Sequence, residues 1–166
     1  MSSKFEGKTS TEGKTSSSAG GKEGGTADVP ATIDVRAIRV DDDGKKGPRE
    51  LEDVLRLEID FDSDTNLNNA RWNIKYMVDV VSKRYIVELG AQNGVDIRQG
   101  SNTFSFSLDS IDMSGVKRKH LINNAGLLTA SLVTNNDQDV IDVNLVVQVA
   151  KSDNGSLVRH ILNPLR

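Results

Sequence analysis

The sequence of 166 residues is long enough for one domain of ordinary size with a tail, and too short for a large two-domain protein. Its formal net charge of −3 argues against a protein that holds nucleic acid through its overall electric field. The sequence contains no cysteine, which excludes disulfides, thiol catalysis and cysteine-bound metals and is typical of an intracellular protein.

Residues 1–30 form a low-complexity segment rich in Ser, Thr, Gly, Lys and Glu, with Phe5 as its only aromatic residue. Such a composition cannot bury enough apolar surface to offset the entropy lost on ordering. We therefore expect a disordered tail over residues 1–30 and no signal peptide within it. One folded domain is expected over residues 31–166.

From residue 31 onward, apolar and polar residues alternate with the period of a half-buried strand. In residues 31–40 the alternation changes phase between Ala37 and Ile38, which predicts a bulge or a strand that moves between two sheets. After a turn-rich connector, further alternating runs follow at residues 55–62, 71–80, 85–89 and 103–108. Trp72 begins the apolar face of its run and is expected to anchor the core.

The last third of the chain holds three apolar runs separated by two turns. The central run, residues 141–149, is apolar at every second position, and the runs 128–132 and 157–161 flank it. Residues 134–139 and 152–156 supply the Asn, Asp and Gly that tight hairpins need. Together these runs and turns predict a three-stranded antiparallel meander. With the earlier runs it predicts an all-β, immunoglobulin-like sandwich of about eight strands. The Gly-rich residues 91–100 and the long segment 110–124 are expected as connections.

Four stretches between residues 51 and 148 resemble the immunoglobulin-like domain of the anti-silencing-function histone chaperones. Residues 57–61 (LEIDF) and 71–76 (RWNIKY) are similar to that family's acidic strand and the Trp-Lys-Ile-x-Tyr-like strand that follows it. Residues 100–109 (GSNTFSFSLD) carry its Gly, Phe-x-Phe and Asp at the same offsets, and residues 126–147 match its paired long strands.

The resemblance implies the same sandwich fold and a protein partner on the sheet of the last strands. In residues 142–146, Asp142 stands where the chaperones carry a basic residue, and their pair of tyrosines is absent. A face made for the same histone helix is therefore not expected. The partner implied is basic or helical, and a histone-like partner stays open.

The outward phase of the last strands contains apolar residues, at Leu127, Val133, Val140 and Val146. They indicate a partner surface, or a face that a loop or the C-terminal segment covers. We predict a partner surface on residues 126–134 and 140–149, with nearby aspartates, among them Asp137 and Asp139, selecting a basic partner. The predicted partner-binding residues are Leu128, Val133, Val140, Asp142, Leu145 and Val146.

Lys117, Arg118 and Lys119 form a short basic patch in the longest connection. This basic loop is either a solvated segment or a contact for phosphate, anionic lipid or an acidic peptide. We expect no catalytic residue, metal ligand or cofactor, because no nucleophile has a recognisable base partner and His120 and His160 have no ligand companions at metal spacing. No nucleic-acid partner is expected. No apolar run reaches membrane-spanning length.

The sequence thus predicts a non-catalytic protein-interaction module, chaperone- or adaptor-like, in the cytoplasm or nucleus. Two alternatives stay open. One is a carrier of a prenyl or acyl chain, with an apolar cavity among Trp72, Tyr76, Phe104, Phe106 and Leu145. The other is a structural component of a cytoskeletal or ciliary assembly, which would place the protein in a cilium or flagellum.

Overall fold

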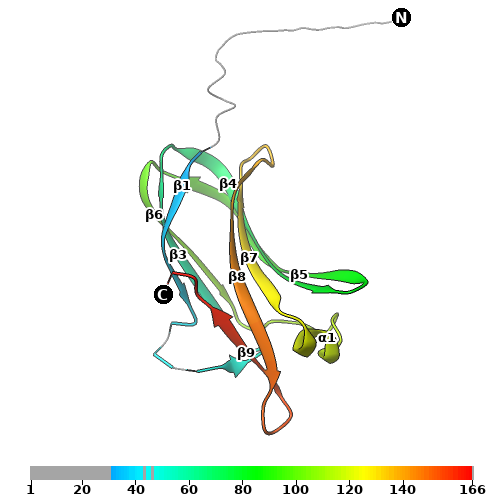
Figure 1. The fold of residues 1–166 in the computed structure, drawn as a ribbon. Helices are drawn as coiled ribbons and strands as arrows, with labels where there is room; N and C mark the ends of the chain where they lie inside the picture. The colour runs from blue at the N-terminus through cyan, green and yellow to red at the C-terminus, as the bar shows by residue number, and fades with distance from the viewer. Residues whose placement is uncertain (1–30, 43, 46, 166) are drawn as a thin grey trace, which may run out of the picture. The chain divides into compact units, whose positions relative to one another are not determined.

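The computed structural model describes residues 31–42, 44–45 and 47–165, and these are mostly β-strands (Figure 1). In chain order the elements are β1 (Ile33–Val40), β2 (Arg49–Glu50), β3 (Leu55–Ser63), β4 (Leu67–Val80), β5 (Lys83–Ile97), β6 (Gly100–Leu108), α1 (Arg118–Asn123), β7 (Gly126–Val133), β8 (Asp139–Lys151) and β9 (Leu157–Leu162). The predicted all-β sandwich is confirmed. The predicted tail lies outside the described residues.

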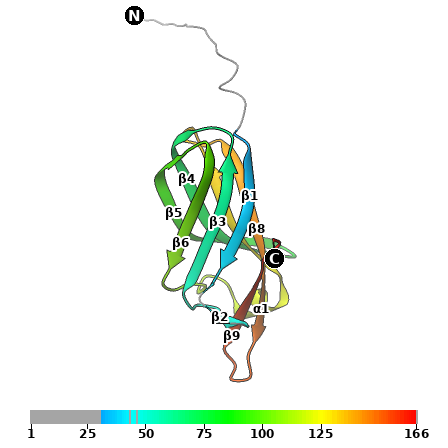
Figure 2. The same ribbon diagram turned by 90° about the vertical axis from the view of Figure 1, so that its left-hand side faces the viewer.

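The strands form two antiparallel sheets, a small one in the order β1-β3-β6 and a large one in the order β2-β9-β8-β7-β4-β5. Figure 2 shows the small sheet from its outer side, with the large sheet behind it. In the large sheet β8 lies between β7 and β9, as predicted for the C-terminal meander. Both predicted turns close with a backbone hydrogen bond, from Thr134 N to Gln138 O at 2.9 Å and from Ser152 N to Ser156 O at 2.8 Å.

The core lies between the inner faces of the two sheets, and aromatic rings join them. Trp72 of β4 is 1% exposed. Its ring stacks on Phe104 of β6 with centroids 4.4 Å apart and meets Phe61 of β3 edge-on at 5.8 Å. Both contacts cross from the large sheet to the small one, so Trp72 is the core anchor that the sequence predicts.

The phase change in the first strand is a bulge. The pairing of β1 with β3 shifts register between Val35 and Ala37, so Arg36 is the extra residue. The whole of β1 stays in the small sheet, and the alternative of a strand that moves between sheets is wrong. After the bulge, Ile38 points into the core and is 6% exposed.

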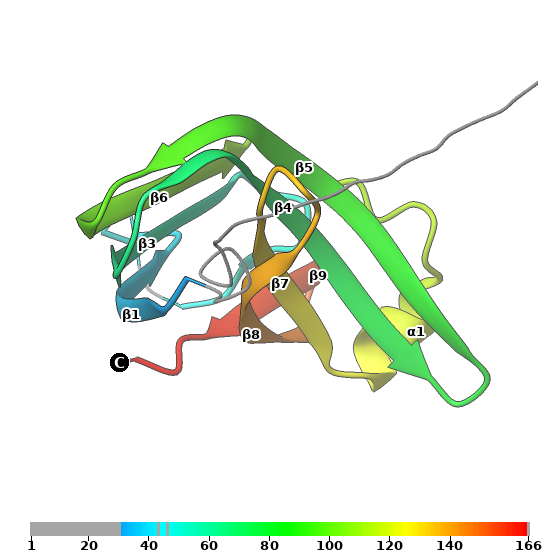
Figure 3. The ribbon, with the colours of Figure 1, turned by 90° about the horizontal axis from the view of Figure 1, so that it is seen from above.

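Two predicted connections contain regular structure. Residues 91–97 continue β5, because bulges in the β4–β5 pairing let the longer strand follow its partner. The missing side chain of Gly90 leaves room for the Phe106 ring, which lies 2.9 Å from the position a Cβ would take. In segment 110–124, residues Arg118–Asn123 form α1, which Figures 1 and 3 show beside the tip of the β4–β5 hairpin.

Candidate protein-interaction face

The outer face of the large sheet carries a line of apolar side chains that crosses five strands. The pairings place Ile86 opposite Met77, Met77 opposite Leu127, Leu127 opposite Val146, and Val146 opposite Leu162. Residues directly opposite one another in antiparallel strands share a face and are direct neighbours. We call these five residues, Ile86 (β5), Met77 (β4), Leu127 (β7), Val146 (β8) and Leu162 (β9), the apolar row.

The apolar row is open to solvent. Ile86 is 51% exposed, Leu127 36%, Val146 38% and Leu162 39%, and Met77 is half-buried. The described residues hold two other exposed large hydrophobic side chains, Val81 at the tip of the β4–β5 hairpin and Leu165 near the C-terminus. At about 200 Å² per fully exposed aliphatic residue, the row presents roughly 300 Å² of surface, the lower end of the range for the largest apolar patch on a typical monomer.

Polar residues flank the apolar row on both sides. One step along the strands lies the first flank, which consists of Glu88, Lys75, Thr129 and Asn144. One step in the other direction lies the second flank, which consists of Arg84, Asp79, Gln148 and His160. The face is therefore amphipathic across the strands. On β4 by itself, Met77 is a single apolar residue between Lys75 and Asp79.

The two flanks differ in how their charges are paired. In the second flank, Arg84 Nε lies 2.6 Å from Asp79 Oδ1, and this hydrogen bond holds the pKa of the Asp79 carboxyl below its usual range. In the first flank, Lys75 and Glu88 have no ion-pair partner among the described residues. Thr129 donates a hydrogen bond to Asn144 Oδ1 at 2.8 Å, which orients the amide of Asn144.

The outer face of the small sheet is polar, and its charges are bound to one another. Arg39 of β1 donates to Glu58 at 2.9 Å and to both oxygens of Asp60 at 2.8 and 2.9 Å. Thr103 of β6 also donates to Asp60 at 2.9 Å, and these bonds, that from Arg39 first, lower the pKa of the Asp60 carboxyl. The two outer faces thus differ in kind, and the apolar one belongs to the large sheet.

Two of the predicted partner-binding residues lie openly on the outer face. Val146 belongs to the apolar row, and Asp142 is exposed on β8 one step beyond Asn144. Val140 is half-buried where the pairing of β7 with β8 shifts register. Of the aspartates expected to select a basic partner, Asp139 is exposed, whereas Asp137 is held by Arg71 at 2.9 Å.

Three predicted partner-binding residues are buried, and their assignment to an exposed surface is wrong. Leu128 and Leu145 oppose each other on the inner face and are 2% and 1% exposed. Val133 points outward but is 6% exposed. It lies opposite Arg71, whose guanidinium reaches Asp137 in the turn after β7 and encloses that end of the strand.

Leu127, Met77, Ile86 and Leu162 are the row residues absent from the predicted set. Leu127 stood in the outward phase that the sequence indicates, so a signal for it existed. The other three need the pairing registers of β4, β5 and β9. The C-terminal segment does not cover the row, because Asn163 donates to the Ile38 carbonyl of β1 and Leu162 is itself exposed.

The basic residues lie away from the apolar row, Arg118 and Lys119 on α1 and Lys117 at its N-cap. Lys117, Arg118 and Lys119 are exposed. Arg118 donates to the Gly155 carbonyl at 2.7 Å and ties α1 to the β8–β9 hairpin. The next residue, His120, packs on the Tyr85 ring with centroids 5.3 Å apart, which attaches α1 to β5. These contacts make the patch part of the packing at one end of the sandwich.

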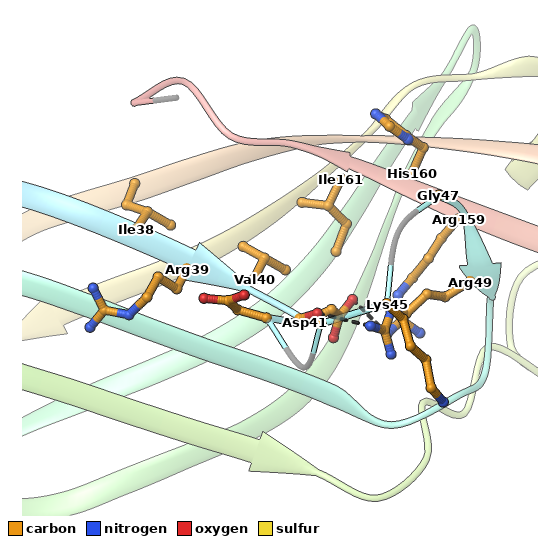
Figure 4. A pocket seen from close by; sticks show the side chains of 12 residues that line it. Ile38, Arg39, Val40, Asp41, Lys45, Gly47, Arg49, Arg159, His160 and Ile161 are labelled. Carbon is orange, nitrogen blue, oxygen red and sulfur yellow. Dashed lines mark hydrogen bonds and ion pairs between the residues drawn. The ribbon is translucent and has the colours of Figure 1, made fainter.

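A groove of about 690 Å³ separates the end of β1 from β9, and Arg159 lies at its floor (Figure 4). Arg159 is 2% exposed. Its guanidinium donates to the carbonyls of Glu50, Leu51, Asp53 and Val54 at 2.7–3.1 Å and to the Asp41 carboxylate at 3.0 Å. Figure 4 shows Arg159 reaching from β9 to Asp41, and the groove thus surrounds an internal clamp that holds the 41–54 connection.

The interior between the sheets is closely packed around Tyr76. The apolar cavity that Tyr76, Leu128 and Val147 line with seven other residues measures about 10 Å³. This is room for about one water molecule, against about 300 Å³ or more in a typical ligand pocket. The aromatic residues expected to line a lipid cavity are instead packed together, with Trp72, Tyr76 and Phe104 each 3% exposed or less. No observation favours the carrier.

Comparison with known proteins gives one weak structural likeness to report. No family model and no curated protein matches the chain. Among solved structures, the chain is similar to a β-glucosidase from Kluyveromyces marxianus in complex with glucose, at 13% identity and a TM-score of 0.38. The match covers 80% of this chain and 14% of that chain. A likeness at this level carries no argument about fold or activity.

No cluster of His, Asp or Glu side chains is arranged to hold a metal ion within residues 31–42, 44–45 and 47–165. Over the same residues, no helix has the length and apolar character needed to cross a membrane.

Proposed function

We propose that the domain is a non-catalytic protein-interaction module that binds a protein partner across the outer face of the large sheet. The observation that carries the proposal is the apolar row, five aliphatic side chains aligned in register over five strands between two polar flanks. Burying such a row against a partner removes apolar surface from water, which is the main driving force of association.

The polar flanks fit the rim of such an interface. Rim charges contribute little affinity but set orientation and choose partners through complementary charge. The unpaired Lys75 and Glu88 and the exposed Asp142 are available for this role. The proposal agrees with the chaperone- or adaptor-like role and the intracellular location expected from the sequence, and with the sheet surface that the resemblance to the anti-silencing-function chaperones implies.

The test is capture of partners by the full chain from the native cell, followed by quantitative identification of what co-purifies. The double variant Leu127→Arg with Val146→Asp should lose the partners of the wild-type chain, because two charges enter the centre of the apolar row. Leu165→Asp is the matched control, because Leu165 is 50% exposed and lies outside the row. It should retain them.

Both variants should unfold thermally within a few degrees of the wild type, since surface substitutions change stability little. Retention of the full partner set by a folded double variant would overturn the proposal. The alternative role in a cytoskeletal or ciliary assembly uses the same face, and the identity of the captured proteins separates the two roles.

A further inference from the structure

We propose that the partner that covers the apolar row is a second copy of this chain, packed face to face about a two-fold axis that runs along the row. The inference rests on the proposed function of this face and names its occupant. It follows from the charges of the two flanks, which the pairing registers place at fixed positions.

A two-fold axis along the row carries each flank onto the opposite flank of the other copy. On β4, Lys75 lies one step to one side of Met77 and Asp79 one step to the other. On β5, Glu88 and Arg84 flank Ile86 in the same way, with Glu88 opposite Lys75 and Arg84 opposite Asp79. In the dimer Lys75 therefore faces Asp79 of the partner subunit, and Glu88 faces Arg84 of the partner subunit.

These two contacts occur twice in a symmetric dimer, because an isologous interface repeats each pair. The existing Asp79–Arg84 ion pair then faces Lys75 and Glu88 of the partner subunit, so each charge of the pair has an opposite charge across the interface. In the single chain Lys75 and Glu88 are cross-strand neighbours, and in the dimer each would also face an opposite charge of the other copy.

The neutral part of the flanks is also complementary under this axis. On β8, Asn144 and Gln148 lie on opposite sides of Val146, so Asn144 faces Gln148 of the partner subunit. The Oδ1 atom of Asn144 already accepts from Thr129. Its amide nitrogen stays available as a donor to the partner's Gln148 side-chain oxygen.

An axis parallel to the strands does not bring together both the charges and the whole apolar row. A two-fold axis parallel to the strands through β7 would place Lys75 against the partner's Asn144, Asp79 against the partner's Gln148 and Arg84 against the partner's His160. It forms no pair of opposite charges. Moved between β4 and β5, the same axis would place Lys75 against the partner's Glu88, but β5 is the edge strand, so β7, β8 and β9 would face no strand of the other copy. The axis along the row is therefore the one that pairs opposite charges and also covers all five row residues.

The apolar contacts are self-complementary under the selected axis. Each row residue meets the same residue of the other copy, and facing aliphatic side chains fill the roughly 10 Å between stacked sheets. Laid flat, five strands and three rows would cover about 24 by 20 Å, and the twist of the sheet, visible in Figure 3, makes the contact smaller than that, at the low end of the range for specific interfaces. We therefore expect a weak, reversible dimer that forms at micromolar concentrations or above.

The experiment is analytical ultracentrifugation of the full chain across the micromolar range. The wild type should pass from monomer to dimer as concentration rises. Val146→Asp should stay monomeric, and the control Leu165→Asp should match the wild type. Lys75→Glu and Asp79→Lys should each weaken the dimer about tenfold or more, because each puts like charges in contact twice.

Mixing the two charge variants distinguishes the axis. In a heterodimer, the Glu introduced at position 75 of one chain faces the Lys introduced at position 79 of the other, and the native Asp79 and Lys75 face each other at the second contact. The mixture should therefore dimerise at concentrations where each variant alone is monomeric. Circular dichroism of each variant confirms that it is folded.

Each failure overturns a different statement. A chain that stays monomeric throughout, while the Leu127→Arg and Val146→Asp double variant still loses captured partners, overturns the dimer and leaves the proposed function standing. Dimerisation that Val146→Asp does not affect overturns the dimer on this face. A dimer that needs Val146 but is not restored on mixing overturns the axis. If the row variants keep both the dimer and the captured partners, the proposed function is overturned as well.

Discussion

The adjacent leucines of β7 test whether the apolar row is assigned to the correct face. Leu127 is 36% exposed on the outer face, and Leu128 is 2% exposed on the inner face. Leu127 and Leu128 are the same residue type in the same strand, and their side chains point to opposite faces of the sheet. Truncating each to alanine, in separate variants, therefore compares an outer and an inner position within one strand.

The expected losses follow from what each side chain contacts. Leu128 lies opposite Tyr76 and Leu145 within the core, so Leu128→Ala removes buried carbons and leaves a cavity. Such substitutions lower the free energy of unfolding by about 3 kcal/mol, within a range of roughly 2 to 5. Leu127→Ala removes partly hydrated surface and leaves no enclosed space, and we expect a loss of about 1 kcal/mol or less.

Equilibrium unfolding in urea measures both losses, at low protein concentration so that self-association does not contribute. With a slope of about 2 kcal/mol per molar urea, Leu128→Ala should lower the midpoint by about 1.5 M and Leu127→Ala by about 0.5 M or less. The slopes themselves should not change. Equal losses, or a larger loss for Leu127→Ala, would refute the assignment of faces and with it the apolar row.

Three further predictions concern the core. Gly126→Ala should cost about 2 kcal/mol in denaturant melts, because the new Cβ would overlap the Tyr76 hydroxyl and ring. Burial raises the pKa of Tyr76 to about 12. The stability that its neutral hydroxyl contributes, about 2–3 kcal/mol, is therefore fully present below pH 10 and is lost as the pH rises through 12. Tyr76→Phe should remove this alkaline loss in pH-dependent melts. Arg159→Met should cost about 3–5 kcal/mol by the same melts, because it removes the buried donor that four backbone carbonyls and Oδ2 of Asp41 share.

The strands and their inner faces could be predicted because the alternation that marks each strand lies within a single run of residues. Alternation in β3, β4 and β8 names the inward side chains directly, and burial alternates along all three strands. The bulge of β1 was visible for the same reason, as a local change of phase. Trp72 could be placed by its size and its position in one run.

The position of Leu128 shows where this reasoning fails. In residues 126–133 apolar side chains occur in both phases, so alternation cannot decide which leucine points inward. The answer comes from the partner strands, since Leu128 lies opposite the buried Tyr76 and Leu145. For the same reason, the substitution Leu128→Arg would test folding, and Leu127→Arg is the variant that tests binding.

The apolar row needs information that no single run contains. Its members stand at positions 77, 86, 127, 146 and 162, and four pairing registers bring them into line. A bulge in the β7–β8 pair, between the turn and the row, shifts that register by one residue, and missing it would break the row. The α-helix α1 was missed because six residues are too few for a helical period to stand out.

The apolar row has two physical readings, and its exposure separates them. Cross-strand aliphatic pairs stabilise a sheet by contact with each other, about 0.2–1 kcal/mol for each pair, and could be retained for that reason alone. That gain comes from contact along the sheet surface and needs no partner above it. Yet with every neighbour in place, four members of the row keep 36–51% of their surface in water, while eight of the ten flanking positions are polar. A ladder that served only the sheet would gain as much from threonine or mixed charges at no cost in exposed apolar area. The remaining exposure is what a partner surface can bury.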